Sequence, residues 1–131
     1  MSTKGILDKH AEELAAVTSL RVDVVEQSDR LFVIIHDYYL PNRLSKVEKT
    51  DVFFITDFQY PFSAMDMFWT DVDVVRPDGS LFEGSEVIED YIGRKWRRFS
   101  YHRNGVWNPA GNPLFDHFAF MEGRWTGKAK R

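Results

Sequence analysis

The N-terminal region alternates between apolar and charged positions with the period of an α-helix. Apolar side chains recur three or four residues apart at Leu7, Ala11 and Leu14, and charged side chains occupy most of the positions between them. A stripe of this spacing faces a protein core along one side of a helix. The pattern therefore predicts an amphipathic N-terminal helix over residues 1–18.

Residues 19–75 carry the pattern of β-strands. Two runs of branched and aromatic residues, "LRVDVVEQ" and "RLFVIIHDYYL", flank the turn-forming pair Ser28 and Asp29, which predicts a β-hairpin. A third run, "TDVFFITDF", is apolar on both faces, as expected of an interior strand. A fourth, "MDMFWTDVDVV", ends before a Pro-Asp-Gly turn. This order predicts a four-stranded antiparallel sheet.

The periodicity fades over residues 76–110, where many charges and several glycines favour loop or short helix. Long irregular segments of compact domains often carry function, so this segment is the expected active-site region. Asn112 and Pro113 then form a helix start, followed by a single apolar stripe. The pattern predicts a C-terminal helix over residues 111–126 and a basic tail over residues 127–131.

Composition and charge narrow the class of protein. A chain of 131 residues that is 44% hydrophobic fits one domain with its own core. The elements above predict a single α+β domain over residues 1–131, with the C-terminal helix packed on the sheet. A net charge of −3 disfavours nucleic acid as a partner. No apolar run is long enough to span a membrane, and the start lacks a signal-peptide pattern, so a cytoplasmic protein is expected.

The candidate chemistry lies in the stretch "WRRFSYH". The chain contains no cysteine, and its histidines lack the neighbouring ligands of a metal site, so neither thiolate chemistry nor a metal or other cofactor is expected. Ser100 precedes His102 by two residues. In an extended segment such residues share a face, so the imidazole of His102 could accept the proton of the Ser100 hydroxyl. The alternative is a loop hydroxyl beside a solvent-facing histidine.

The run "YYLPN…TDVFFITDFQYPFSAMDMFWTD…WRRFSYH…VWNP" resembles prokaryotic E2 family E, a bacterial branch of the ubiquitin-conjugating (E2) proteins. E2 proteins carry a Tyr-Pro-Phe segment after the third strand. Here Tyr60, Pro61 and Phe62 match it, whereas Ala64 and Met65 stand where prolines are expected. The resemblance implies an E2/UBC-like fold over most of the chain.

The resemblance also implies a role for Ser100. In E2 enzymes the acceptor cysteine lies shortly before the tryptophan of a Trp-Ser-Pro-like turn, and Ser100 lies 107 − 100 = 7 residues before Trp107 of "WNP". Ser100 would therefore carry the cargo as an oxygen ester, with His102 as the assisting base. The His-Pro-Asn triplet of E2 enzymes is missing. An oxyanion contact is then expected from Asn104, Asn108 or backbone amides.

The resemblance implies partners as well. They are an E1-like adenylating enzyme of the ThiF type, a ubiquitin-like protein and a JAB-type deconjugating protease, in bacterial stress or phage defence. The protein would be a transferase that passes its cargo to an amine. Basic side chains that could bind these partners, or form ordinary solvated surface, are Arg94, Lys95, Arg97, Arg98, Lys4 and Lys9.

A second class of function stays open at this point. The missing cysteine and the missing His-Pro-Asn triplet favour a catalytically inactive scaffold, similar to E2 variants, that binds an E1-like or ubiquitin-like partner.

Overall fold

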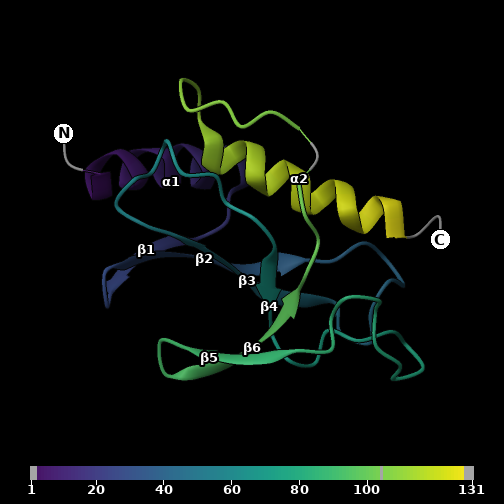
Figure 1. Cartoon of the computed structure of the whole chain (residues 1–131). Coiled ribbons are helices and arrows are strands. Elements are labelled where there is room, and N and C mark those ends of the chain that lie inside the picture. The colour runs from purple at the N-terminus through teal and green to yellow at the C-terminus, as the bar shows by residue number, and fades with distance from the viewer. Residues whose placement is uncertain (1–2, 104, 129–131) are drawn as a thin grey trace.

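The computed structural model describes residues 3–103 and 105–128, with side chains up to residue 125. Within these ranges the chain forms a helix, six strands and a second helix (Figure 1). The elements are α1 (Thr3–Thr18), β1 (Val22–Gln27), β2 (Arg30–Tyr39), β3 (Lys49–Thr56), β4 (Phe68–Thr70), β5 (Ile88–Tyr91), β6 (Arg94–Phe99) and α2 (Pro113–Lys128).

The strands of the described chain form one antiparallel sheet of six strands, in the order β1-β2-β3-β4-β6-β5. The prediction of four strands was therefore wrong. The two additional strands, β5 and β6, form a hairpin within residues 76–110, where loop or short helix was expected. In the sequence of β6, "RKWRRF", only Trp96 and Phe99 are buried, so charged residues obscure the strand pattern.

The β1–β2 hairpin lies where the sequence predicts it, because its turn is specified locally. Gln27 pairs with Arg30 across a two-residue loop. The loop residues Ser28 and Asp29 have φ angles of 52° and 63°. Positive φ at both central positions is the signature of a type I′ turn, whose twist matches that of the flanking strands.

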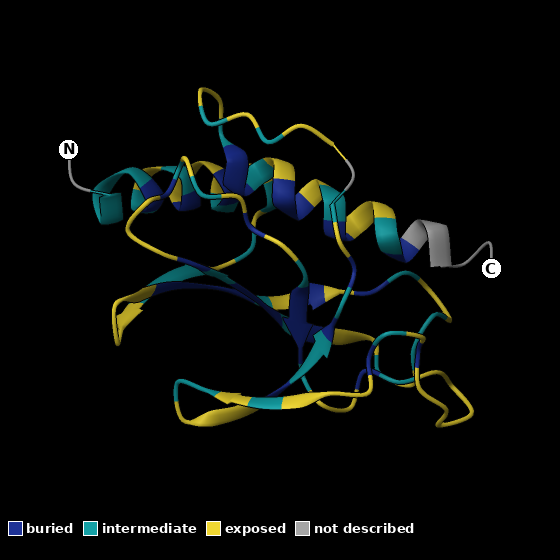
Figure 2. Ribbon diagram, in the orientation of Figure 1, coloured by how far each residue is buried: buried dark blue, intermediate teal, exposed yellow. Residues whose placement is uncertain are grey.

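Both helices cover one face of the sheet, and the main core lies between them and the strands (Figures 1 and 2). Phe54 of β3 points into this core, together with Leu7 of α1 and Phe118 of α2. The buried aromatic and aliphatic side chains of α2 confirm the predicted packing of the C-terminal helix on the sheet. No helix in the described part of the chain has the length and apolar character needed to cross a membrane.

A second, smaller core lies on the opposite face, under the curled β5–β6 hairpin. Phe53 is fully buried there and stacks on Trp96 of β6, with ring centroids 4.5 Å apart. The ring of Tyr91, at the end of β5, also stacks on the ring of Phe53, with the two centroids 5.5 Å apart. Adjacent residues of β3 thus enter different cores, which confirms the predicted interior strand.

Candidate functional site

The strand β6 ends at a sharp bend centred on Ser100. The amide of Ser100 donates to the carbonyl oxygen of Gly84 at 3.0 Å, and the amide of Tyr101 donates to that of Phe99 at 2.9 Å. A hydrogen bond between residues i+2 and i closes a γ-turn, a frequent device at strand ends. Tyr101 consequently turns inward and is 7% exposed, whereas Ser100 is half-buried at the end of the sheet.

The loop before β5 holds this bend in place. The hydroxyl of Tyr101 donates to the carbonyl oxygen of Glu83 at 2.7 Å. Gly84 has a φ of +81°, and a Cβ added there would lie 3.2 Å from Cε1 of Tyr101. Both the backbone angle and the close ring favour glycine at this position. The backbone around Ser100 is therefore fixed by a neighbouring loop as well as by β6.

The hydroxyl of Ser100 accepts a hydrogen bond from a cation. Nε of Arg98 donates to Oγ of Ser100 at 3.0 Å. Nη1 of the same guanidinium lies 3.3 Å from Oε2 of Glu89, whose Oε1 accepts a bond of 2.8 Å from the indole of Trp69. Trp69 and Arg98 are also register partners in the β4–β6 pairing. The arrangement links the "MFW" strand to Ser100 through Glu89 and Arg98.

His102 is held by a carboxylate from a distant part of the sequence. Its Nδ1 lies 2.5 Å from Oδ2 of Asp66, and Oδ1 of Asp66 accepts from the amide of Arg103 at 3.2 Å. When Nδ1 donates to Asp66, Nε2 is left as the proton acceptor. Between the described side chains of Ser100 and His102 the structure shows no hydrogen bond. The alternation expected of an extended "SYH" stops at Phe99, because the γ-turn replaces the strand.

His117 of α2 is a buried packing residue beside this site. Its Nε2 donates to the carbonyl oxygen of Met67 at 2.7 Å, and its Nδ1 faces Nη1 of Arg103 at 3.4 Å. The ring is fully buried and makes an edge contact with Phe54. Burial lowers the pKa of His117 to about 4, because the charged form would lose its hydration.

This low pKa predicts a loss of stability in acid. His117 is protonated below about pH 6.5 in the unfolded chain but only below about pH 4 in the folded chain. The free energy of unfolding should therefore fall by about 3 kcal/mol across this window and gain nothing from His117 above it. Urea unfolding at pH 7 and pH 4.5 measures the change. His117→Gln should lack this loss of stability in acid. The control His102→Gln, which alters an exposed ring, should retain it. Equal acid sensitivity in the wild type and both variants would contradict the assignment to His117.

Arg97 and Arg94, two of the arginines considered for partner binding, form hydrogen bonds and ion pairs within the protein. Arg97 donates to the carbonyl oxygens of Val72 and Ser85, at 2.9 and 2.7 Å, and so fastens two loops to β6. Arg94 lies at the start of β6, at the opposite end of the strand from Ser100. Together with Arg98, these side chains already have partners within the protein.

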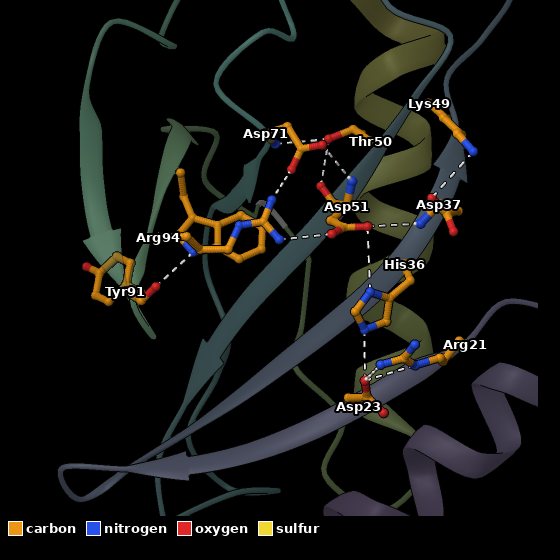
Figure 3. Close-up of polar contacts among 11 residues, drawn as sticks. Arg21, Asp23, His36, Asp37, Lys49, Thr50, Asp51, Asp71, Tyr91 and Arg94 are labelled. Atoms are coloured by element: carbon orange, nitrogen blue, oxygen red, sulfur yellow. Dashed lines mark hydrogen bonds and ion pairs between the residues drawn. The ribbon is translucent and has the colours of Figure 1, made fainter.

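Arg94 belongs to a polar network that crosses the sheet (Figure 3). Its guanidinium stacks over the ring of Trp96 at 4.0 Å and pairs with two carboxylates, Asp51 at 3.0 Å and Asp71. Burial raises the pKa of Asp71, and the neighbouring carboxylates of Asp51 and Asp73 act in the same direction, whereas the Arg94 guanidinium lowers it. The network continues through His36 to Asp23 and Arg21.

Of the three lysines considered for partner binding, Lys9 and Lys95 are exposed and Lys4 is partly buried. Lys95 pairs with Asp90 and Lys4 with Asp8 in surface ion pairs of 3.2 and 3.1 Å, which contribute little to stability. Lys9 is exposed and forms no ion pair with any described residue. In the part of the chain that the structure describes, no group of three metal-ligating side chains could hold a metal ion.

Among the described residues, no side-chain amide donates a hydrogen bond to Oγ of Ser100. Oδ1 of Asn108 accepts from the amide of Ala110 at 3.1 Å, within its own turn. Asn104 lies outside the described residues. The backbone amides of Ser100 and Tyr101 are both used in the bend. Within the described part of the chain, the guanidinium of Arg98 donates the hydrogen bond that Oγ of Ser100 accepts.

The Tyr-Pro-Phe segment and the Trp-Asn-Pro turn, which carry the E2 resemblance, are in direct contact. The indole of Trp107, from the Trp-Asn-Pro turn, donates to the carbonyl oxygen of Pro61 at 2.6 Å. Tyr60 is buried, and its hydroxyl accepts from the amide of Leu114 at 3.2 Å and lies 2.6 Å from Nδ1 of His10. These contacts hold the segment downstream of Ser100 against the segment that carries Asp66.

Two helices on one face of a curled antiparallel sheet, with the Tyr-Pro-Phe segment tied to a Trp-Asn-Pro turn, are consistent with an E2-like fold. The family model of prokaryotic E2 family E matches residues 7–126, nearly the whole chain, and the chain therefore belongs to prokaryotic E2 family E. No curated protein and no solved structure matches the sequence. Family membership supports an E2-like role and suggests a conjugating transferase.

Proposed function

We propose that this protein accepts a ubiquitin-like protein from an E1-like enzyme as an oxygen ester on Ser100 and passes it to an amine. The position of Ser100 carries the proposal. Ser100 stands 107 − 100 = 7 residues before the tryptophan of the Trp-Asn-Pro turn, inside the matched family region. The turn is anchored to Pro61 of the Tyr-Pro-Phe segment. Because the chain has no cysteine, a hydroxyl is the acceptor at this site.

The reaction needs a base, because a serine hydroxyl does not ionise at neutral pH. His102, oriented by Asp66 at 2.5 Å, takes the proton as Oγ of Ser100 attacks the activated carbonyl carbon. The bond from this carbon to sulfur or to the adenylate oxygen then breaks. In the second step an amine attacks the ester and the C–Oγ bond breaks. The approach of His102 to Ser100 occurs in the complex, where catalytic hydrogen bonds commonly tighten.

The partners follow from the same chemistry. A ThiF-type adenylating enzyme activates the carboxyl terminus of the ubiquitin-like protein, and a JAB-type protease removes the cargo later. The exposed Lys9 and Lys95 and the partly exposed Lys4 offer positive charge for docking. We place the pathway in the bacterial cytoplasm and connect it with stress or phage defence.

The alternative is a scaffold that binds the same partners without forming a covalent bond. It is favoured by the missing His-Pro-Asn triplet and by the separate hydrogen bonds of Ser100 and His102 among the described residues.

One incubation separates the two functions. The protein is mixed with its E1-like enzyme, ATP and the ubiquitin-like protein, and adducts are resolved by electrophoresis. An ester should resist thiol reductant and be cleaved by hydroxylamine or mild base, and mass spectrometry should locate it on Ser100. Stable binding of the E1-like enzyme with no adduct would instead establish the scaffold.

A further inference from the structure

The charge that develops on Oγ of Ser100 is the main chemical obstacle to ester formation, since oxygen holds a negative charge far less readily than sulfur. The structure places a permanent cation on this atom. Nε of Arg98 donates to Oγ at 3.0 Å, and hydrogen bonds from ionised donors are about twice as strong as neutral ones. An arginine keeps its charge throughout the physiological pH range.

The position of this guanidinium is fixed before any substrate arrives. Its other side pairs with Glu89 at 3.3 Å, and Glu89 is itself held by the indole of Trp69 at 2.8 Å. The Arg98 and Glu89 side chains are only 29% and 27% exposed. A preorganised, partly shielded donor stabilises developing charge better than mobile water does.

The same guanidinium has a donor left for the substrate. Nη2 of Arg98 has no hydrogen-bond partner among the described residues, and it lies on the same edge of the planar group as Nε. This edge binds two coplanar oxygens at once, as in arginine–carboxylate pairs. The Oγ and carbonyl oxygens of an ester at Ser100 present a similar pair. The nearby amides of Ser100 and Tyr101 are already used.

We propose that Arg98 is a catalytic residue of the acyl transfer at Ser100, stabilising negative charge on Oγ and on the substrate carbonyl oxygen; this inference rests on the proposed function. When the ester forms, the Oγ–carbon bond is made, the hydroxyl proton passes to His102, and the activated leaving group departs with its electron pair. When the ester is aminolysed, the C–Oγ bond breaks and Oγ takes up the proton lost by the amine. Arg98 keeps its own protons in both steps.

A thiol placed at position 100 reports the electrostatic effect without any partner protein. Ser100→Cys introduces the single cysteine of the chain, so iodoacetamide alkylation monitored by mass spectrometry reports this site alone. A cation at hydrogen-bond distance should lower the thiol pKa from about 8.5 to below about 7.5. Adding Arg98→Gln should raise it by about one unit or more and slow alkylation at pH 7 by roughly tenfold. Adding Lys95→Gln, which removes an exposed charge from the same strand, should change neither value.

Several charged groups surround this thiol, so each comparison is made within one background. Glu89 of β5 pairs with the Arg98 guanidinium beside position 100, Asp66 and His102 lie at the same end of the sheet, and Arg124 of α2 stacks on the neighbouring Tyr101 ring at 4.5 Å. If Arg98→Gln does not fold, the Ser100→Cys thiol is titrated in the native protein and in urea. The native pKa should be lower by at least about one unit. No difference there, or a thiol pKa insensitive to Arg98→Gln, overturns the inference.

A kinetic comparison tests the same charge during transfer. With Ser100 in place, Arg98→Gln should slow ester formation by about 10²- to 10³-fold, as expected for loss of an oxyanion donor. With Ser100→Cys the loss should be much smaller, because sulfur carries negative charge unaided. Equal losses in both backgrounds would mean that Arg98 only maintains the structure. An adduct that never forms while the thiol pKa behaves as expected rejects the proposed function and leaves the electrostatic role of Arg98 established.

Discussion

Ser100→Ala should abolish the covalent adduct with the ubiquitin-like protein, and Ser100→Cys should convert it into one that thiol reductant cleaves. Alanine removes the oxygen that bonds to the carbonyl carbon, whereas cysteine supplies a sulfur at the same place. The chain contains no cysteine, so a reductant-sensitive adduct in Ser100→Cys can arise only at position 100. Electrophoresis with and without reductant, followed by hydroxylamine treatment, distinguishes the two bonds.

Ser63 provides a matched control for this substitution. Its hydroxyl donates to Asp57 at 2.8 Å, on the Tyr-Pro-Phe side of the protein, and it has no place in the proposed chemistry. Ser63→Ala should therefore leave the adduct unchanged. Persistence of the adduct in Ser100→Ala would assign the acceptor to another residue. Retained binding of the E1-like enzyme by a wild-type protein that forms no adduct would point to the scaffold.

The parts of the fold that the sequence predicts correctly are specified by short-range signals. The β1–β2 turn depends on two neighbouring residues, Ser28 and Asp29, that tolerate positive φ. The apolar stripe of α2 depends on spacing within one helix, and the double-sided apolar pattern of β3 depends on consecutive residues. Each signal is complete within one element, so no knowledge of the tertiary contacts is needed.

The β5–β6 hairpin escapes prediction because its strands are stabilised by tertiary contacts. Four of the six residues of β6 are basic, and β5 occupies the edge of the sheet, where charged side chains are common. Their strand character depends on Trp96 stacking over Phe53 and on Arg98 pairing with Trp69 across the sheet. Neither contact is visible in the local alternation of apolar and polar residues.

The candidate site divides in the same way. The hypothesis for Ser100 rests on its distance to Trp107, read against the E2 resemblance, and it stays a prediction. The contact of Ser100 with Arg98 escapes prediction, although the two residues are only two positions apart, because Arg98 lies in a run of basic residues that fits a partner-binding or solvated surface equally well. Asp66 was missed because 36 positions separate it from His102 and only the folded chain brings them together. The bend at Ser100 depends on a hydrogen bond from Ser100 to Gly84 and has no local sequence signal.

His102→Ala should slow ester formation on Ser100 by about 10²- to 10⁴-fold at neutral pH, the usual range for loss of a general base. The loss should diminish at high pH, where hydroxide assists removal of the proton. Rates of adduct formation at saturating E1-like enzyme, measured from pH 6 to pH 9, give the profile. His36→Ala is the matched control, because His36 belongs to the polar network at the far end of the sheet and should leave the rate unchanged.

Asp66→Asn tests whether His102 acts as a base that Asp66 orients or has only a structural role. The carboxylate accepts from Nδ1 of His102 at 2.5 Å and from the amide of Arg103 at 3.2 Å, which holds the imidazole with Nε2 as the proton acceptor. Asparagine keeps the shape but can present its amide nitrogen to Nδ1, which favours the other tautomer. Asp66→Asn should therefore slow ester formation with Ser100, and it should add no further loss in the His102→Ala background, because the two side chains act through one imidazole. Independent, additive losses would show that Asp66 supports the site by another route, and an unchanged rate in His102→Ala would assign proton removal to a different group.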